Sequence, residues 1–213
     1  MENNSKAKRF FTEEEKKKIE ETTRDVESRT LGEIAVMVVG SSDRYIEAEI
    51  LGGIFAGSLI SLIITALYFN SSVWSFIPAS LVLFFPARFL FGKFPVLKTS
   101  LIGFRRKEET VRQRAVSAFY EKGLYKTRQN TGVLFFISIL ERKVWVLADK
   151  GIHKKIGQET LNKFALTVSQ GIKDGRACDS LCNAIREAGA LLAKHFPVTP
   201  GDTDELPDKV MTE

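Results

Sequence analysis

The sequence of 213 residues is poor in the residue types on which several protein classes depend, with two cysteines, two histidines and six prolines. Two cysteines cannot form the disulfide framework that holds small secreted domains together. His153 and His195 are too few for a histidine-based zinc site or relay. Because 44% of the residues are hydrophobic, disorder of the whole chain is also excluded.

Two further absences concern processing and phosphate chemistry. The N-terminal segment has no apolar stretch followed by a small-residue cleavage site, so we expect no secretory signal peptide. Cys178 and Cys182 lie four residues apart in a predicted helix, and we interpret them as free thiols of a reducing compartment. There is no GxxxxGK[ST] phosphate loop, and neither cysteine begins a CxxxxxR phosphate loop.

Charge is missing from one long region. Residues 50–87 contain no Asp, Glu, Lys, Arg or His over 38 positions. Residues 50–69 and 73–91 form two apolar segments around a short polar break, and 20 helical residues at about 1.5 Å each cross the roughly 30 Å core of a bilayer. These segments predict a transmembrane helical hairpin. The alternative is a buried hairpin of a soluble protein.

A basic segment follows this hairpin and predicts its orientation. The polar break between the two spans has no positive charge. Six cations precede the next acid, and we expect them at the membrane interface: Arg88, Lys93, Lys98, Arg105, Arg106 and Lys107. The positive-inside rule places this side, and with it both termini, in the cytoplasm. We assign the excess charge to anionic lipid and expect no nucleic-acid partner, because no nucleic-acid-binding motif accompanies it.

Small residues recur at every fourth position of the first span. Gly53 and Gly57 form a GxxxG motif that Ser61 extends. Such spacing lets two helix backbones approach closely. The partner helix is either the second span or a second copy of the chain.

The remaining sequence alternates between helical and strand patterns. Thr12 and Glu15 form a capping box at the start of the first helix. The predicted helices are 12–29, 108–122, 158–172 and 177–195, and the predicted strands are 33–39, 133–140 and 143–148. We expect an α/β fold, a three-layer α/β/α sandwich with a small mixed sheet. This domain is discontinuous (1–49 and 99–196), with the hairpin and basic segment inserted at 50–98 and a disordered tail at 197–213.

Two acids at strand ends are the candidate metal ligands. Asp43 follows the first strand and Asp149 follows the third. If those strands are parallel, both acids lie at the carboxyl edge of the sheet, where oxygen ligands could hold a divalent cation such as calcium. The alternative is that both are turn or cap residues.

Two phrases of the sequence resemble the TPM domain family. They are TLGEIAVMVV at 30–39, with Gly32, Glu33 and Ile34, and TGVLFFISILERKVWVLADKGI at 131–152. The second phrase matches the family's pattern at Gly132, Val133, Leu134, Arg142, Val144 and Gly151. With its inserted hairpin the chain resembles a bacterial membrane-protein branch of the family. The resemblance implies an α/β/α sandwich, and relatives include acid phosphatases, calcium binders and accessory proteins, some of which accompany LemA-like membrane proteins.

Two functional hypotheses follow. The first is a membrane-anchored TPM-like domain that acts as an accessory or interaction module at the cytoplasmic face of a bacterial inner membrane, next to a LemA-like protein as the resemblance implies. The alternative is a metal-dependent acid phosphatase. Because the sequence contains a complete fold pattern and an incomplete catalytic one, it favours the first.

Overall fold

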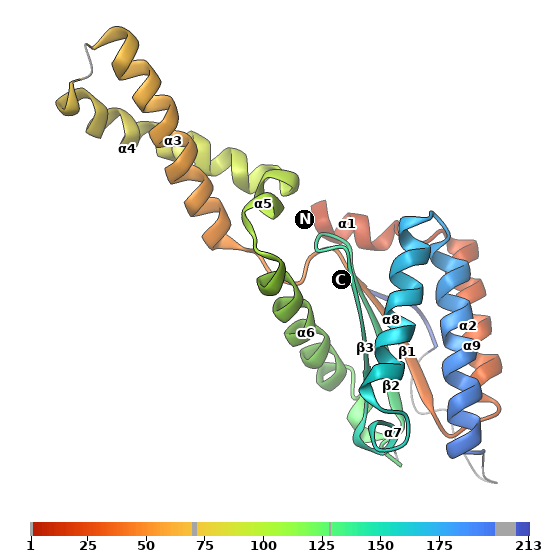
Figure 1. Cartoon of the computed structure of the whole chain (residues 1–213). Helices are drawn as coiled ribbons and strands as arrows, with labels where there is room; N and C mark the ends of the chain where they lie inside the picture. The colour runs from red at the N-terminus through yellow and green to blue at the C-terminus, as the bar shows by residue number, and fades with distance from the viewer. Residues whose placement is uncertain (1, 70–71, 128, 199–207) are drawn as a thin grey trace. The chain divides into compact units, whose positions relative to one another are not determined.

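The computed structural model describes residues 2–69, 72–127, 129–198 and 208–213. Contacts within the chain divide it into two compact units (Figure 1). We call Met1–Ser42 together with Glu108–Glu213 the α/β unit, and Asp43–Lys107 the hairpin unit. The α/β unit is therefore discontinuous in sequence.

A four-stranded mixed sheet forms the centre of the α/β unit. Its strands, in the spatial order β3-β2-β1-β4, are β1 (Glu33–Val39), β2 (Gly132–Ser138), β3 (Lys143–Ala148) and β4 (Met211–Thr212). Strand β1 is parallel to β2 and to β4, whereas β2 and β3 are antiparallel. Every residue of β1 and β2 is buried, as expected for strands covered on both faces.

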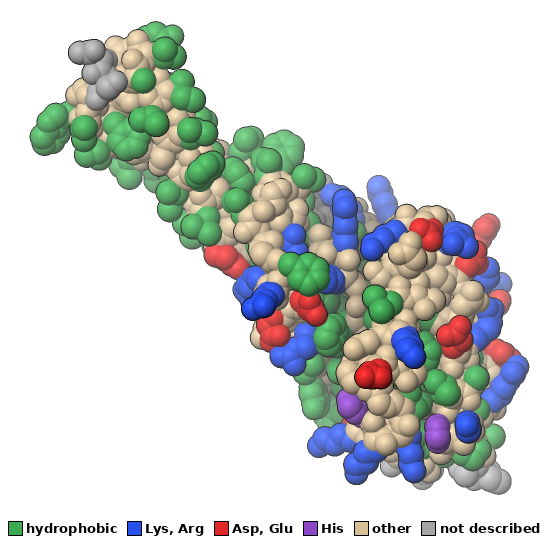
Figure 2. Space-filling model, viewed as in Figure 1, with side chains coloured by type: hydrophobic (Ala, Val, Ile, Leu, Met, Phe, Trp, Pro, Cys, Tyr) green, Lys and Arg blue, Asp and Glu red, His purple; other side chains and the backbone are tan. Residues whose placement is uncertain are grey.

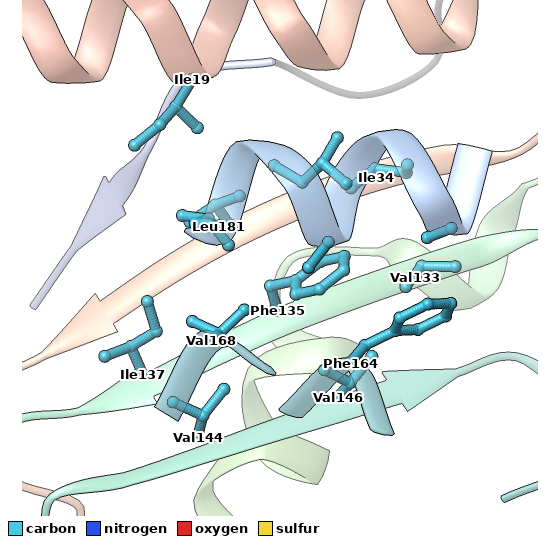
Figure 3. Packing of buried hydrophobic residues seen from close by; sticks show 14 of the residues in the cluster. Ile19, Ile34, Val133, Phe135, Ile137, Val144, Val146, Phe164, Val168 and Leu181 are labelled. Carbon is cyan, nitrogen blue, oxygen red and sulfur yellow. The ribbon is translucent and has the colours of Figure 1, made fainter. Parts of the chain in front are cut away.

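One face of the sheet is covered by α2 (Glu13–Glu27), α8 (Gln158–Lys173) and α9 (Ala177–His195). Alternate side chains of the strands, such as Phe135, pack against these helices (Figure 3). Helix α2 begins where the capping box predicts, because the Thr12 hydroxyl accepts from the Glu15 amide and the Glu15 carboxylate accepts from the Thr12 amide.

The opposite face is covered by α6 (Phe104–Glu121), which starts in the hairpin unit and continues into the α/β unit. Its apolar residues, including Val111 and Phe119, pack with Met37 and Phe136 of the sheet. Helices on both faces of a small mixed sheet make the three-layer α/β/α sandwich that the sequence predicted.

The structure corrects two local predictions. Residues 197–213 were expected to be disordered; residues 199–207 lie outside the described part of the chain, but β4 pairs with β1 at Met37 and Val38. A strand of two residues in a polar tail has no periodicity from which it could be predicted. The strand predicted at 133–140 ends at Ser138, and residues 139–142 form a four-residue turn, closed by the Arg142 amide donating to the Ile139 carbonyl at 3.2 Å.

Four short helical segments complete the described part of the chain. Residues flanking the central elements form α1 (Glu2–Lys8), α7 (Lys150–His153) and the 3₁₀ helix η1 (Leu124–Lys126) in the α/β unit. In the hairpin unit, α5 (Pro95–Leu101) follows the two long helices. Segments of three to seven residues carry too few periodic positions for the sequence to indicate them.

The hairpin unit contains α3 (Ile46–Tyr68) and α4 (Val73–Lys93). Both are long and apolar enough to span a membrane, with mean hydropathies of 2.3 and 1.6 over their most apolar windows. Only 28% and 6% of those windows are buried, so the rest of the described chain does not enclose these helices as it would a core helix. Large hydrophobic side chains cover much of their surface in Figure 2.

Candidate functional site

The helix interface of the hairpin is built from small residues. Gly53, Gly57 and Ser61 are buried on α3 and face α4. A Cβ atom at Gly57 would lie 3.0 Å from the Phe84 backbone nitrogen, and the Ser61 hydroxyl donates to the Phe76 carbonyl at 3.1 Å. These three small residues therefore let α3 and α4 of the same chain pack closely.

The outward face of the same helices has the opposite composition. Large apolar side chains are exposed there, such as Phe55 at 69%, Leu67 at 73% and Leu81 at 67%. Water penalises such a continuous apolar surface, whereas hydrocarbon does not. The arrangement, with small residues inside and large ones outside, is typical of helices that face lipid.

The start of α3 and the segment after α4 are joined by ion pairs. Lys98 donates to Glu49 at 2.5 Å and to the Arg44 carbonyl at 2.8 Å, and both charged side chains of this pair are mostly buried. Arg106 binds Asp43 at 3.0 Å and Glu47 at 3.2 Å at a more exposed position. Two of the six predicted interface cations are thus neutralised by Glu47 and Glu49 in the first turn of α3 and by Asp43 just before it.

The other four predicted interface cations are differently placed. Arg88, Lys93 and Arg105 are exposed and Lys107 is partly buried, and none of the four has an ion-pair partner within the described part of the chain. The Cβ of Arg88 lies 2.9 Å from the position that a Cβ would take at Gly53, so the base of its side chain packs against α3. These cations keep their charge available for an external anion.

The last residue of the α/β unit before the hairpin, Ser42, is held by a network of hydrogen bonds at the carboxyl end of β2. The Ser42 amide donates to Glu141 at 3.0 Å, and the Ser42 hydroxyl donates to Ser138 at 2.9 Å. The Ser138 hydroxyl in turn donates to Glu141. Because Glu141 is 6% exposed, these bonds satisfy a carboxylate that would otherwise be costly to bury.

The chain re-enters the α/β unit at Glu108, whose carboxylate lies 3.8 Å from Lys143. Lys143 is the first residue of β3 and directly follows the turn that holds Ser42. Both connections to the hairpin unit are therefore fixed at one end of the sheet, the end formed by the β2–β3 turn.

The predicted metal site is not assembled by the sheet. It required parallel first and third strands, but β1 is parallel to β2 and β2 is antiparallel to β3, so β1 and β3 run in opposite directions. Asp149 consequently follows β3 at the edge where β1 begins. Its carboxylate caps α7 by accepting from the Lys150 amide at 2.6 Å, while Asp43 accepts from the Arg44 amide at 2.6 Å and binds Arg106.

No group of three or more His, Cys, Asp or Glu side chains among the described residues is placed to hold a metal ion. A metal-dependent phosphatase would need a ligand set other than Asp43 with Asp149. Asp149 is the N-cap residue of α7, as in the alternative interpretation, whereas Asp43 lies in the loop between β1 and α3.

Two titratable groups elsewhere in the α/β unit have strongly raised pKa values. Burial, reinforced by Cys182, raises the pKa of the Cys178 thiol to about 12, and its sulfur donates weakly to the Glu15 carbonyl at 3.8 Å. Both cysteines are free and buried, so they act as apolar core residues. Burial, together with a hydrogen bond to Asp208, raises the pKa of Glu27 to about 10, against the opposing effect of the Ile34 amide.

Sequence reasoning missed several of these residues. Thr65 continues the spacing of Gly53, Gly57 and Ser61, and it is also buried on α3, so the period of four was the available signal. The partners Glu49 with Lys98 and Ser42 with Glu141 are 49 and 99 residues apart, and no local pattern connects them.

Comparisons with known proteins agree with this architecture. The family model of the TPM domain matches residues 97–191, a range that includes Gly132, Arg142 and Gly151 but not Gly32. The NMR structure of BA42 protein from the psychrophilic bacterium Bizionia argentinensis is similar with a TM-score of 0.58 and 22% sequence identity, covering 95% of this chain and 94% of that one. At that identity the likeness shows the fold. No curated protein sequence matches the chain.

Proposed function

Because a family model of the TPM domain matches residues 97–191, and two helices long enough to span a membrane precede that match, we propose that the chain is a membrane-anchored interaction module. The observation that carries this proposal is the reversed packing of the hairpin unit, in which Gly53 and Gly57 are buried while Phe55 and Leu67 are exposed. Hydrocarbon is the solvent in which such a surface is stable.

The charges of the hairpin unit support an orientation. Arg88, Lys93, Arg105 and Lys107 follow the first span and have no ion-pair partner among the described residues, whereas the short loop between the spans has no cation. Under the positive-inside rule the α/β unit then lies in the cytoplasm of a bacterial cell, at the inner membrane. Each such cation near an anionic surface contributes roughly 1 kcal/mol to its attraction.

The proposed role of the α/β unit is to bind another membrane protein, and the family resemblance implies a LemA-like partner. Both connections to the hairpin leave the unit beside the β2–β3 turn, so the rest of its surface is not used for attachment. A domain held near the bilayer meets a membrane partner at a raised effective concentration.

The experiment is fractionation followed by affinity purification of the tagged full chain. We expect the chain to stay with the membranes after an alkaline carbonate wash and, after solubilisation in detergent, to retain a second membrane protein in a fixed ratio. Release by the wash would contradict the anchor. Purification without a reproducible partner would contradict the role as a module.

A further inference from the structure

A cavity of about 540 Å³ lies in the α/β unit beside the β2–β3 turn. Phe10, Ile139 and Ile172 give it an apolar wall, and Arg142, Lys143 and Lys173 supply cations at its lining. Its volume is within the range of small-molecule sites, which combine a mostly apolar lining with a few polar groups.

The charge of this lining is of one sign. No acidic side chain is among the described residues that form it. Lys143 is bound to Glu108, but Arg142 and Lys173 make no ion pair in the described part of the chain. The nearby Glu141 is not part of the lining, and it accepts hydrogen bonds from Ser42 and Ser138. The lining is therefore complementary to an anion that carries an apolar body.

Arg142 has an unfavourable backbone conformation for its residue type. Its φ of 53° is in the left-handed region, which besides glycine only Tyr45 and Asn130 share among the described residues. Glycine or asparagine would adopt this conformation at lower cost. The turn thus places an arginine at a backbone position that an uncharged residue such as asparagine would occupy with less strain. This indicates that the Arg142 side chain itself has a role at the cavity.

Two residues that line the cavity also bind the residues at which the chain leaves and re-enters the α/β unit. Ser138 and Lys143 line it, and the same side chains bind Ser42 and Glu108, where the chain leaves and re-enters the α/β unit. Only residues 43–45 separate Ser42 from α3. If the hairpin spans a bilayer, this is the end of the unit that is tethered to it.

We propose that this cavity binds an anionic phospholipid of the surrounding membrane. The phosphate is held by the guanidinium of Arg142 and the ammonium of Lys173, and an acyl chain lies against Phe10, Ile139 and Ile172. This inference rests on the proposed function, because the membrane is the source of the lipid. It adds a specific lipid site to the diffuse attraction of the interface cations.

The first test is native mass spectrometry of the full chain released from micelles that contain phosphatidylglycerol or phosphatidylcholine. We expect one tightly retained phosphatidylglycerol and no retained phosphatidylcholine. Arg142→Asn, which keeps a residue suited to the left-handed region, should lower retention about fivefold or more without loss of thermal stability. Lys163→Gln, a matched loss of charge on α8 outside the cavity, should leave retention unchanged.

A purely structural Arg142 would give the opposite result, since its replacement would lower stability and leave lipid retention equal to that of the wild type. Equal losses from Arg142→Asn and Lys163→Gln would also overturn the site, because they would indicate attraction by charge alone.

The second test uses soluble probes and does not require that the chain span a membrane. Dihexanoyl phosphatidylglycerol should bind the detergent-solubilised chain at least about tenfold more tightly than glycerophosphoglycerol, which has the same headgroup without acyl chains. Equal binding would overturn the apolar part of the site. Binding of the short-chain lipid by a chain that carbonate removes from membranes would refute the anchor and assign the cavity to a free amphiphile rather than to a bilayer lipid.

Discussion

The α/β unit and the two long helices of the hairpin unit bury opposite kinds of side chain. In the α/β unit large residues such as Phe135 are buried, and the exposed large hydrophobic residues in its described part are Tyr120, Tyr125, Leu166 and Val198. In α3 and α4 of the hairpin unit, the buried residues are small, such as Gly53, Gly57 and Ser61, and large hydrophobic residues are exposed. This difference indicates that the two parts of the chain are stable in different solvents. Burial of large apolar groups lowers the free energy in water, whereas it gives no such stabilisation in lipid.

The largest expected effect comes from removing the same type of side chain, a phenylalanine ring, from each unit. Phe135→Ala removes a ring with 0% exposure and should cost about 3–5 kcal/mol of the stability of the α/β unit. Phe55→Ala removes a ring that is 69% exposed and should cost less than about 0.5 kcal/mol. Hydrogen exchange of the β2 amides measures the first cost and exchange of the α3 amides measures the second; equal costs would contradict the comparison.

Burial from water also predicts a pH dependence in the α/β unit. The pKa of Glu27 is raised to about 10, so the stabilisation by its neutral form is complete below the unfolded pKa of about 4.3 and is lost as pH rises toward the folded value. The loss is at most about 1.4 kcal/mol per pH unit. Glu27→Gln should flatten this slope in thermal unfolding between about pH 5 and pH 9. Parallel curves for the two proteins would show that Glu27 is ionised in the fold.

A third prediction concerns the small residues that α3 buries against α4. Gly57→Leu places a side chain against the Phe84 backbone and should weaken the packing of α3 on α4 by about 1–3 kcal/mol. Gly103→Leu meets nothing within 4 Å and is the matched control. Spin labels at positions 59 and 82 should move apart in the Gly57 variant alone; an unchanged distance would place the interface elsewhere.

The ion pairs of the hairpin unit give the smallest expected effect. Lys98→Met leaves Glu49 unpaired at a mostly buried position and should cost about 1–2 kcal/mol. Lys17→Met breaks an exposed pair with Glu21 and should cost less than about 0.5 kcal/mol. A double-mutant cycle with Glu49→Gln isolates the pair energy. A coupling no larger than that of the exposed pair would mean that water screens both alike.

Much of the fold was predictable because its signals are local. The continuous apolar strand at 33–39 and the helix at 177–195 agree with the observed bounds, since periodicity and flanking residues define both. Gly53 and Gly57 carry their signal in a spacing of four. By contrast, β4 depends on pairing with a strand more than 170 residues away in sequence, and the tail itself has no strand pattern.

The candidate site was less predictable because it depends on strand direction and distant charges. Asp43 and Asp149 both follow strands, but no local pattern gives the relative direction of β1 and β3. Counting charges along the sequence left Lys98 and Arg106 unpaired, although Glu49, Asp43 and Glu47 neutralise them in the structure. The strain at Arg142 is likewise visible only in the backbone.

Labelling of single introduced cysteines with a membrane-impermeant maleimide tests the central claim, that the hairpin crosses a bilayer and returns the chain to its starting side. Cys178 and Cys182 are buried and give little background. We expect Ser72→Cys to react in intact spheroplasts, whereas Val198→Cys, in the α/β unit, should react only after the membrane is permeabilised. Reaction of Val198→Cys in intact spheroplasts, or protection of Ser72→Cys there, would contradict it.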